Sequence, residues 1–365
     1  MATSHQLHID DLLRTAVERD ASDIHIKAES PPLLRIYGEL IPMDLPPLSG
    51  DEAKRLSYAI LNEKERELFE QHWELDLGYH IEGLARFRVN LFVQRTMIGS
   101  VFRIIPLHIQ TIEELGLPEV CRYFAERPRG LVLVTGPAGS GKSTTQAAMI
   151  DHVNKTSPVH IMTVEDPIEF AHEPKVALVN QRELGRDTRS FQNALKYVLR
   201  QDPDVILVGE MRDLDTVQLA IRAAETGHLV IGTLHTTDAV QTVDRVIDVF
   251  PTHQQQQIRM QLSVNLLGVV SQILVKRADG RGRVAAFETL TAISSVRNSI
   301  RERKTHQISS VIQTGSQHGM MTLDQSLSQL ARSGVISFEE GEGKAKDRME
   351  YRQLVETGEA VAAKA

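Results

Sequence analysis

The stretch GPAGSGKS, residues 136–143, constrains the fold of this chain more than any other feature. It fits the pattern G-x-x-x-x-G-K-[S/T], it follows the apolar run LVLVT, and a helical pattern comes directly after it. In this context the glycines let backbone N–H groups turn inward around phosphates, and the helix N-terminus adds its positive dipole end. A chance glycine-rich turn is not expected to have both flanks, so the stretch predicts a site for ATP or GTP.

Two side chains of this loop have predicted roles of their own. Lys142 is expected to reach the β- and γ-phosphates, and the hydroxyl of Ser143 is expected to bind Mg²⁺. The predicted cofactors are therefore ATP and Mg²⁺. The residues expected to contact the nucleotide are Gly136, Pro137, Ala138, Gly139, Ser140, Gly141, Lys142, Ser143 and Thr144.

The region around the loop alternates apolar runs with helical stretches. Runs that are apolar throughout are typical of strands in a parallel sheet that is buried on both faces. The sequence therefore predicts an α/β domain built on such a sheet, and the expected strands lie in LVLVTG, HIMTVED, DVILVGE and HLVIGTLH.

The first hundred residues have a different pattern. A helix is expected at residues 9–17, a strand in SDIHIK, a hairpin that turns at Gly38, and charged helical sequence at residues 51–72. LARFRVNLFVQR alternates between apolar and polar side chains, which is typical of a strand with one buried face. We therefore predict an N-terminal α+β domain over residues 1–105.

The remaining boundaries follow from proline, charge and helix signals. Residues 106–118, PLHIQTIEELGLP, are predicted to be an interdomain linker, and residues 119–345 to be the ATPase domain with its C-terminal helices. TLDQSLSQLARSG predicts a helix that starts with a capping box of Thr322 and Gln325 and ends at Gly334. Residues 346–365 are polar and alanine-rich and are predicted to be a frayed tail.

Three of the expected strands end beside side chains suited to nucleotide chemistry. Glu210 is a candidate to hold Mg²⁺ through water, the alternative being a surface carboxylate. Glu165 is a candidate to orient or deprotonate the attacking water, the alternative being a solvent-facing residue beside an Asp-Pro turn. His228 and His235 flank HLVIGTL. Their spacing is not a zinc pattern, so from the residues alone both are predicted to be structural.

Composition excludes several classes of protein. The single cysteine, Cys121, excludes a disulfide framework and a multi-cysteine zinc site, and we expect it to be a small buried residue. We expect no signal peptide and no membrane-spanning segment, because no basic start with an apolar run and no long apolar stretch is visible. The net charge of -7 argues against broad nucleic-acid binding.

Taken together, these segments resemble the secretion ATPase superfamily over nearly the whole chain, and they look most like its PilT-type retraction ATPases. The matching stretches, in chain order, are ASDIHI, RFRVNLFVQR, GPAGSGKSTT, VEDPIE, ILVGEMRD, GHLVIGTLHTTDA and GMMTLDQS. The resemblance implies a PAS-like N-terminal domain followed by a RecA-like P-loop ATPase domain, assembled into a homo-hexameric ring. It also implies that Glu165 is the catalytic glutamate, Glu210 the Mg²⁺ carboxylate and His235 a γ-phosphate contact.

The resemblance also gives the arginines of the N-terminal domain a candidate role. Arginines of this domain reach the nucleotide in the family, so Arg86, Arg88 and Arg95 are candidate catalytic residues, and Arg103 is a further possibility. One well-placed arginine at a transferred phosphoryl group is worth on the order of 10³-fold in rate. The alternative is a solvated strand face, and it is expected for at least one of these arginines.

The subgroup is suggested by an absence and by one helix. Pilus-assembly and type II secretion ATPases usually carry a four-cysteine zinc module, which a chain with one cysteine cannot build, so no zinc is expected. Retraction ATPases carry a helix with the sequence AIRNLIRE. SVRNSIRE, residues 295–302, matches this helix except at Ser295, Val296 and Ser299. The resemblance therefore implies an ATP-hydrolysing motor that powers type IV pilus retraction.

The expected surroundings of such a motor also come from the resemblance. Its partners are an inner-membrane platform protein and, indirectly, pilin, and its location is the cytoplasm, peripherally at the inner membrane at the pilus base. An accessory ATP-binding partner of a retraction motor stays an alternative, and a pilus-assembly or type II secretion ATPase is a weaker one. A translocase on nucleic acid is disfavoured, because aromatic residues make up only 5% of the chain and offer few stacking platforms.

Overall fold

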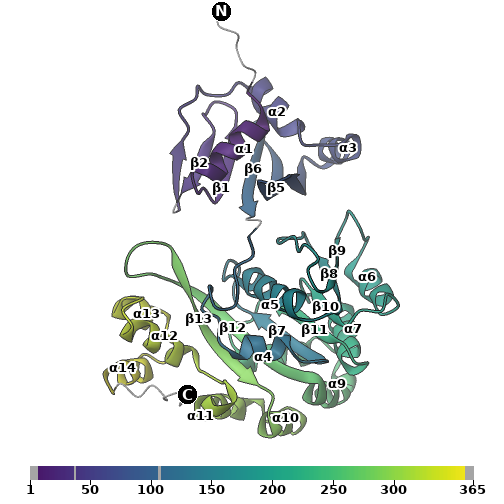
Figure 1. Cartoon of the computed structure of the whole chain (residues 1–365), viewed down its shortest axis with the longest axis vertical. Helices are drawn as coiled ribbons and strands as arrows, with labels where there is room; N and C mark the ends of the chain where they lie inside the picture. The colour runs from purple at the N-terminus through teal and green to yellow at the C-terminus, as the bar shows by residue number, and fades with distance from the viewer. Residues whose placement is uncertain (1–6, 37, 106–107, 358–365) are drawn as a thin grey trace, which may run out of the picture. The chain divides into compact units, whose positions relative to one another are not determined.

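The computed structural model describes residues 7–36, 38–105 and 108–357, and the chain divides into two compact units (Figure 1). The first unit comprises Met1–His108 and Pro167–Ala171, and the second comprises Ile109–Asp166 and His172–Ala365. Residues 109–118 of the predicted linker thus belong by their contacts to the second unit, and Ile109 and Ile112 are buried. A hinge in this stretch stays a prediction.

The first unit is an antiparallel sheet with helices. Among the described residues its strands are ordered β3-β2-β1-β6-β5-β4. The expected alternation in β5 is confirmed, because Phe87, Val89 and Leu91 are fully buried while the residues between them are half-buried. The elements are α1 (Ile9–Glu18), β1 (Asp23–Lys27), β2 (Leu33–Ile36), β3 (Glu39–Pro42), α2 (Gly50–Tyr58), α3 (Glu63–His72), β4 (Glu74–Ile81), β5 (Ala85–Gln94) and β6 (Met97–Ile105).

The charged stretch 51–72 is helical as predicted, and it forms two helices, α2 and α3. The second helix has its own start, since the Asn62 side chain accepts a hydrogen bond from Glu65 N and the Glu65 carboxylate accepts one from Asn62 N. Such a capping box satisfies backbone N–H groups that a continuing helix would not expose. At the other end of α3, Trp73 adopts a left-handed conformation (φ 62°), and its side chain is 66% exposed.

The second unit is built on a seven-stranded sheet with the order β13-β12-β7-β11-β10-β8-β9 among the described residues. β12 and the five strands after it in this order run parallel, and β13 pairs antiparallel with β12. The predicted parallel sheet is confirmed. Its strands are β7 (Gly130–Thr135), β8 (His160–Glu165), β9 (Leu178–Glu183), β10 (Val205–Val208), β11 (Leu229–Leu234), β12 (Leu266–Lys276) and β13 (Arg283–Thr291).

Helices pack on this sheet and enclose two apolar clusters, in which the strand residues of β7, β10 and β11 are buried. Cys121 is fully buried, as predicted, and burial raises the pKa of its thiol to about 12. The helices are α4 (Val120–Ala125), α5 (Lys142–Thr156), α6 (Phe191–Val198), α7 (Leu214–Glu225), α8 (Ala239–Asp248), α9 (Thr252–Asn265), α10 (Ser294–Arg301), α11 (Ile308–Thr314), α12 (Leu323–Arg332), α13 (Phe338–Lys344) and α14 (Arg348–Thr357).

The C-terminal helices α12, α13 and α14 gather beside β12 and β13 (Figure 1). The predicted capping box of Thr322 and Gln325 is confirmed. The predicted frayed tail from residue 346 onward is wrong for residues 348–357, which form α14 around the fully buried Tyr351. Its ring packs against Gly341, where an added Cβ would lie 2.2 Å from the hydroxyl oxygen. Residues 358–365 of the tail lie outside the described residues.

The segment between α13 and α14 is tied to the sheet by charge. Lys346 Nζ lies 2.8 Å from Glu288 Oε2 on β13 and 3.4 Å from Asp238 Oδ2 at the start of α8. The Asp324 carboxylate accepts hydrogen bonds from the backbone N–H groups of Lys346 and Asp347, both at 2.8 Å. All three carboxylates are buried, and these contacts fix the chain directly before α14.

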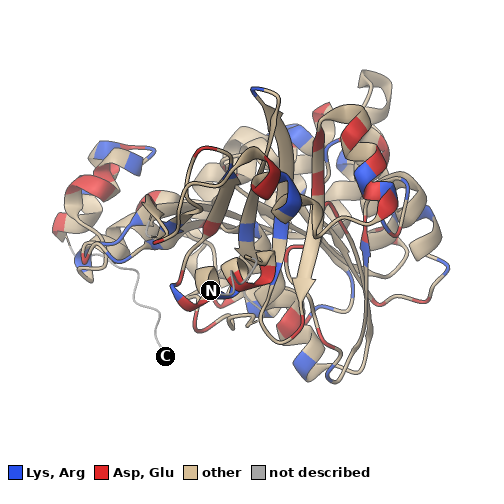
Figure 2. Ribbon diagram, turned by 90° about the horizontal axis from the view of Figure 1, so that it is seen from above, with Lys and Arg blue, Asp and Glu red and all other residues tan. Residues whose placement is uncertain are grey.

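Charged residues of both signs are interspersed along the helices (Figure 2). In the seven-stranded sheet, by contrast, β7, β10 and β11 contain no charged residue. Helix α3, EKERELFEQH, is an example of this mixture. Within the described ranges, no helix is long and apolar enough to cross a membrane.

Candidate nucleotide site

Four parallel strands bring most of the predicted site residues to one edge of the sheet. β7, β11, β10 and β8 are neighbours in that order and run in the same direction, so their carboxyl ends share an edge. The phosphate loop follows β7, His235 follows β11, Glu210 follows β10, and Glu165 ends β8. Ligands of open parallel sheets bind at this edge, so the arrangement is that of a nucleotide site.

The phosphate loop has the backbone conformation that its glycines predict. Gly136, Gly139 and Gly141 all have positive φ angles, of 142°, 73° and 88°. Gly141 stands directly before α5, so the loop ends at the N-terminus of a long helix. Positive φ is readily available only to glycine, and it lets successive N–H groups converge on an anion.

Lys142 lies within the loop and is 91% buried. Its ammonium donates hydrogen bonds to the carbonyl oxygens of Gly136 (2.8 Å) and Pro137 (3.0 Å). The side chain therefore curls back over the loop, which keeps its charge at the position where the phosphates of a nucleotide would lie.

Glu165 is held by two neighbours on the sheet. Its Oε1 accepts hydrogen bonds from the Thr163 hydroxyl (2.6 Å) and from the Gln181 amide (3.1 Å). The Gln181 side chain accepts in turn from His172 N at 2.7 Å. Glu165 is half-buried and bonded to the sheet, and its catalytic role stays a prediction.

Glu210 and His235 are brought together although they follow different strands. His235 Nε2 donates to Glu210 Oε1 at 2.8 Å, and Arg212 Nε donates to Glu210 Oε2. Burial alone would raise the pKa of the Glu210 carboxyl, but the hydrogen bonds from His235 and Arg212 outweigh it and lower the pKa from its ordinary value. Glu210 is therefore an anion that two donors already orient.

Gly209 explains why a glycine precedes this glutamate. A Cβ added to Gly209 would lie 3.1 Å from both the Cα of Glu165 and the carbonyl oxygen of Val164. The Gly209 carbonyl also accepts a hydrogen bond from the Thr233 hydroxyl on β11. A side chain at this position would push the ends of β8 and β10 apart by a few tenths of an ångström.

The two histidines differ in position. His228 stands before β11 and donates through Nδ1 to the carbonyl oxygen of Ala223 at the end of α7 (2.9 Å). It therefore lies at the opposite edge of the sheet from His235 and braces a turn. The structural role predicted for His228 agrees with this contact.

The arginine candidates belong to the first unit. Arg86 and Arg88 project from the half-buried face of β5, and Arg88 Nη1 lies 3.9 Å from Glu169 Oε1. Arg95 is in the tight turn between β5 and β6, where it has a φ of 46°. Arg103 donates to the buried Asp23 carboxylate at 3.0 Å. Contact of any of these arginines with nucleotide stays a prediction.

Residues that sequence reasoning missed lie under the phosphate loop. Gln272 on β12 is 2% exposed, and its side chain bonds both to the loop and to Thr145 on α5. The signal was present, because the polar pair Ser271-Gln272 interrupts the otherwise apolar run LLGVVSQILV. The sequence alone does not show which part of the fold these two polar side chains contact.

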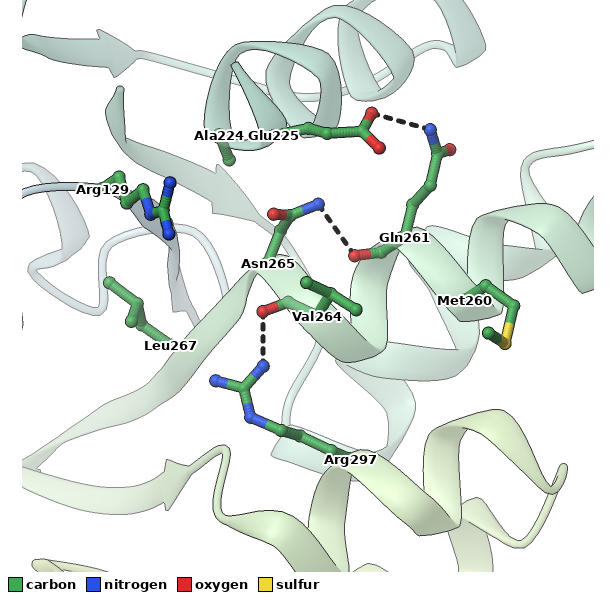
Figure 3. Close-up of a pocket in the computed structure, with 10 residues that line it drawn as sticks. Arg129, Ala224, Glu225, Met260, Gln261, Val264, Asn265, Leu267 and Arg297 are labelled. Carbon is green, nitrogen blue, oxygen red and sulfur yellow. Dashed lines mark hydrogen bonds between the residues drawn. The ribbon is translucent and has the colours of Figure 1, made fainter. Parts of the chain in front are cut away.

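A hollow of about 500 Å³ lies at the other edge of the same sheet, where the strands begin (Figure 3). Its lining includes Gly130 at the start of β7, Leu267 on β12 and Arg297 on α10. Arg297 donates to the carbonyl oxygens of Ser263 (2.7 Å), Val264 and Ala292 (2.7 Å). Arg297, the first arginine of SVRNSIRE, thus caps α9 and fixes α10 to it.

The predicted Mg²⁺ site can be compared with the donor atoms that the structure offers. Within the described residues, no group of three or more His, Cys, Asp and Glu side chains is placed to hold a metal ion. Ser143 in the first turn of α5 and the Glu210 carboxylate offer only oxygen donors, and these are the donors that Mg²⁺ prefers. The residues therefore fit Mg²⁺ that is held mainly by nucleotide phosphates and water.

Comparison with known proteins shows what the whole chain is similar to. The chain matches the family model for type II/IV secretion system proteins over residues 3–365. It is 52% identical over 340 residues to the type IV pilus retraction ATPase PilT of Pseudomonas aeruginosa, which covers 93% of this chain and 98% of that protein. It is 50% identical over 336 residues to a twitching motility protein of Neisseria gonorrhoeae, which covers 92% and 90%.

A solved structure gives the same result for the fold. The crystal structure of the pilus retraction motor PilT with bound ADP aligns with a TM-score of 0.88 at 45% identity, and the alignment covers 94% of this chain and 98% of that one.

Proposed function

Because this chain belongs to the type II/IV secretion system proteins and, among them, to the PilT-type retraction ATPases, we propose that it is a Mg²⁺-dependent motor that couples ATP hydrolysis to type IV pilus retraction. The observation that carries the proposal is the shared edge of β7, β11, β10 and β8. The phosphate loop, His235, Glu210 and Glu165 follow or end these strands in that spatial order.

The loop residues bind and orient the nucleotide. Backbone N–H groups of residues 138–144 surround the phosphates, Pro137 having none to donate, and the Lys142 ammonium exchanges its bonds to loop carbonyls for bonds to the β- and γ-phosphates. The Ser143 hydroxyl and, through water, the Glu210 carboxylate would hold Mg²⁺, which would supply positive charge beside these phosphates when bound.

The strand-end acids and the histidine act on the γ-phosphate. Glu165, held by Thr163 and Gln181, orients the attacking water and takes up its proton. His235 is hydrogen-bonded to Glu210 and is proposed to contact the γ-phosphate. Its contacts would then differ between the ATP-bound and the ADP-bound site. Arg86, Arg88 and Arg95 are proposed to stabilise the transferred phosphoryl group.

The assembly proposed for this activity is a homo-hexamer. It acts on a platform protein of the inner membrane and through it on pilin, from the cytoplasmic side at the pilus base. Motion of the first unit against the second, with residues 106–118 as the hinge, would convert each hydrolysis into displacement.

Steady-state ATP hydrolysis with Mg²⁺, measured against protein concentration, tests the proposal. Specific activity that rises with concentration is expected, because arginines from one subunit complete the site of another. The Glu165→Gln variant is expected to lose turnover by about 10²-fold or more and to keep ATP binding. Glu173→Gln makes the same change at an exposed glutamate and is the matched control. ATP binding without turnover at every concentration would instead favour an accessory partner.

A further inference from the structure

Strand β12 extends past the end of its neighbour β7 and underlies the phosphate loop. The last paired residues are Ser271 on β12 and Thr135 on β7, and the chain leaves β7 into the loop at Gly136. Gln272 is therefore the first β12 residue beyond this pairing. The loop rests on it, and its side chain is 98% buried.

The Gln272 side chain joins the loop to the helix that follows it. Its Nε2 donates to the carbonyl oxygen of Ser140 at 2.7 Å, and its Oε1 accepts from the Thr145 hydroxyl at 2.8 Å. The direction of both bonds is determined, since a carbonyl oxygen only accepts and an amide nitrogen only donates. The Ser140 carbonyl oxygen thus fixes which end of the amide faces the loop, and the Thr145 hydroxyl holds the other end.

The backbone of Gln272 also contacts the loop. A Cβ added to Gly136 would lie 2.2 Å from the Gln272 carbonyl oxygen, and one added to Gly141 would lie 3.1 Å from Gln272 Nε2. The first and last glycines of the motif therefore both border this one residue. Their lack of side chains permits the close approach.

The bond to Ser140 has a consequence for the anion site. In a trans peptide the C=O and the following N–H point in opposite directions. When Gln272 holds the Ser140 carbonyl oxygen on the side of β12, the N–H of Gly141 is directed away from β12, toward the side on which phosphate binds. Released from this bond, the peptide plane can rotate and withdraw that donor.

We propose that Gln272 is a positioning residue for nucleotide binding, and that it keeps the phosphate loop in its binding conformation with an amide whose oxygen is held by Thr145. The proposal rests on the phosphate loop binding nucleotide, as proposed above. Its effect is on affinity and not on the chemical step, because Gln272 touches the loop from the side opposite the ligand.

The test uses the full-length protein and ADP as the probe, with affinity measured by titration calorimetry. Gln272→Met keeps the length of the side chain and removes both bonds, and it is expected to weaken ADP binding about tenfold. Thr145→Val removes only the donor and is expected to weaken binding about threefold. Thr145→Ser restores the hydroxyl and is expected to restore the affinity. Gln329→Met, at an exposed glutamine of α12, is the matched control.

Turnover separates positioning from a general loss of structure. In Gln272→Met the KM for ATP is expected to rise about tenfold, while kcat at saturating ATP stays within about threefold. ADP affinity within twofold of the wild type in both Gln272→Met and Thr145→Val would overturn the proposal. If Gln272→Met does not fold, the contrast between Thr145→Val and Thr145→Ser decides alone.

Lys142→Ala distinguishes failure of this inference from failure of the proposed function. If Lys142→Ala abolishes ADP binding and the Gln272 and Thr145 variants do not weaken it, the loop binds nucleotide and only the positioning role is wrong. If Lys142→Ala leaves ADP binding unchanged, the loop is not the nucleotide site and both proposals are wrong.

Discussion

The two units hold their polar side chains in different ways. In the second unit Lys142, Glu165 and Glu210 follow buried strands, and each is bonded to a defined partner beside it. In the first unit Arg88 stands on a half-exposed sheet face and Arg95 in a hairpin turn. A site at the ends of parallel strands is fixed by the sheet itself, whereas a face of an antiparallel sheet fixes only which side the residues occupy.

The strongest test of this contrast uses two histidines. Burial lowers the pKa of His172 in the second unit to about 4 from 6.5, with opposing contributions from Asp151 and Lys175. The fold holds the neutral ring, so its contribution to stability is complete above pH 6.5 and is lost as the pH falls toward 4. The free energy of unfolding falls between pH 7 and pH 4, and this decrease is expected to be about 3 kcal/mol smaller in His172→Leu than in the wild type. Calorimetry at the two pH values measures the difference.

His25 is the counterpart in the first unit. Burial and Arg35 lower the pKa of His25, and Asp23 opposes them, so the sign of the pH dependence is the same. The His25 ring is less enclosed than that of His172. His25→Leu is therefore expected to reduce the pH dependence of the free energy of unfolding less than His172→Leu does. An equal reduction in the two variants would contradict the contrast between the units.

The next largest difference is expected between two ion pairs. Lys346→Met leaves the buried Glu288 and Asp238 without their cation and is expected to destabilise the second unit by about 2 kcal/mol. Arg103→Met is expected to change the first unit by only about 0.5 kcal/mol, since Arg103 is largely exposed and Arg35 still lies 3.8 Å from Asp23. Thermal unfolding of both variants at pH 7 measures the difference. A larger loss in Arg103→Met would reverse the comparison.

A pair of glycines gives the smallest effect and the most specific one. Gly209→Ala is expected to displace Glu165 by a few tenths of an ångström and to lower kcat about tenfold without weakening ADP binding. Gly83→Ala, in a turn of the first unit with a φ of 71° and nothing within 4 Å, is expected to lower stability by about 1 kcal/mol and to leave kcat unchanged. Hydrolysis assays at saturating ATP distinguish them, and an unchanged kcat in Gly209→Ala would show that the spacing of β8 and β10 is not critical.

The same contrast explains what could be predicted from the sequence. The phosphate loop and the acids after apolar runs were predictable, because both features depend on residues that are close together in the sequence. The strand order was not, since apolar runs do not say which strands are neighbours. The contact of Gln272 with the loop depends on the register of β12 against β7, which pairs residues more than a hundred positions apart.

One undetected helix boundary and one wrong prediction have local causes. The division of residues 51–72 at Asn62 could have been found, because Asn62 and Glu65 have the spacing of a capping box. Helix α14 could not, because its polar composition conceals a single buried anchor, Tyr351, whose hydroxyl donates to the carbonyl oxygen of Phe338. Tertiary contact by one aromatic side chain decided the structure of that segment.

The exposed Trp73 at the end of α3 has a practical consequence for anyone who studies this chain in solution. It is the only tryptophan in the sequence, and it belongs to the first unit. Tryptophan fluorescence therefore reports on one unit only, and from a side chain that water already surrounds. Tryptophan emission would report neither unfolding nor refolding of the second unit, which contains the nucleotide site. A tryptophan introduced into the second unit would be needed to follow them by fluorescence.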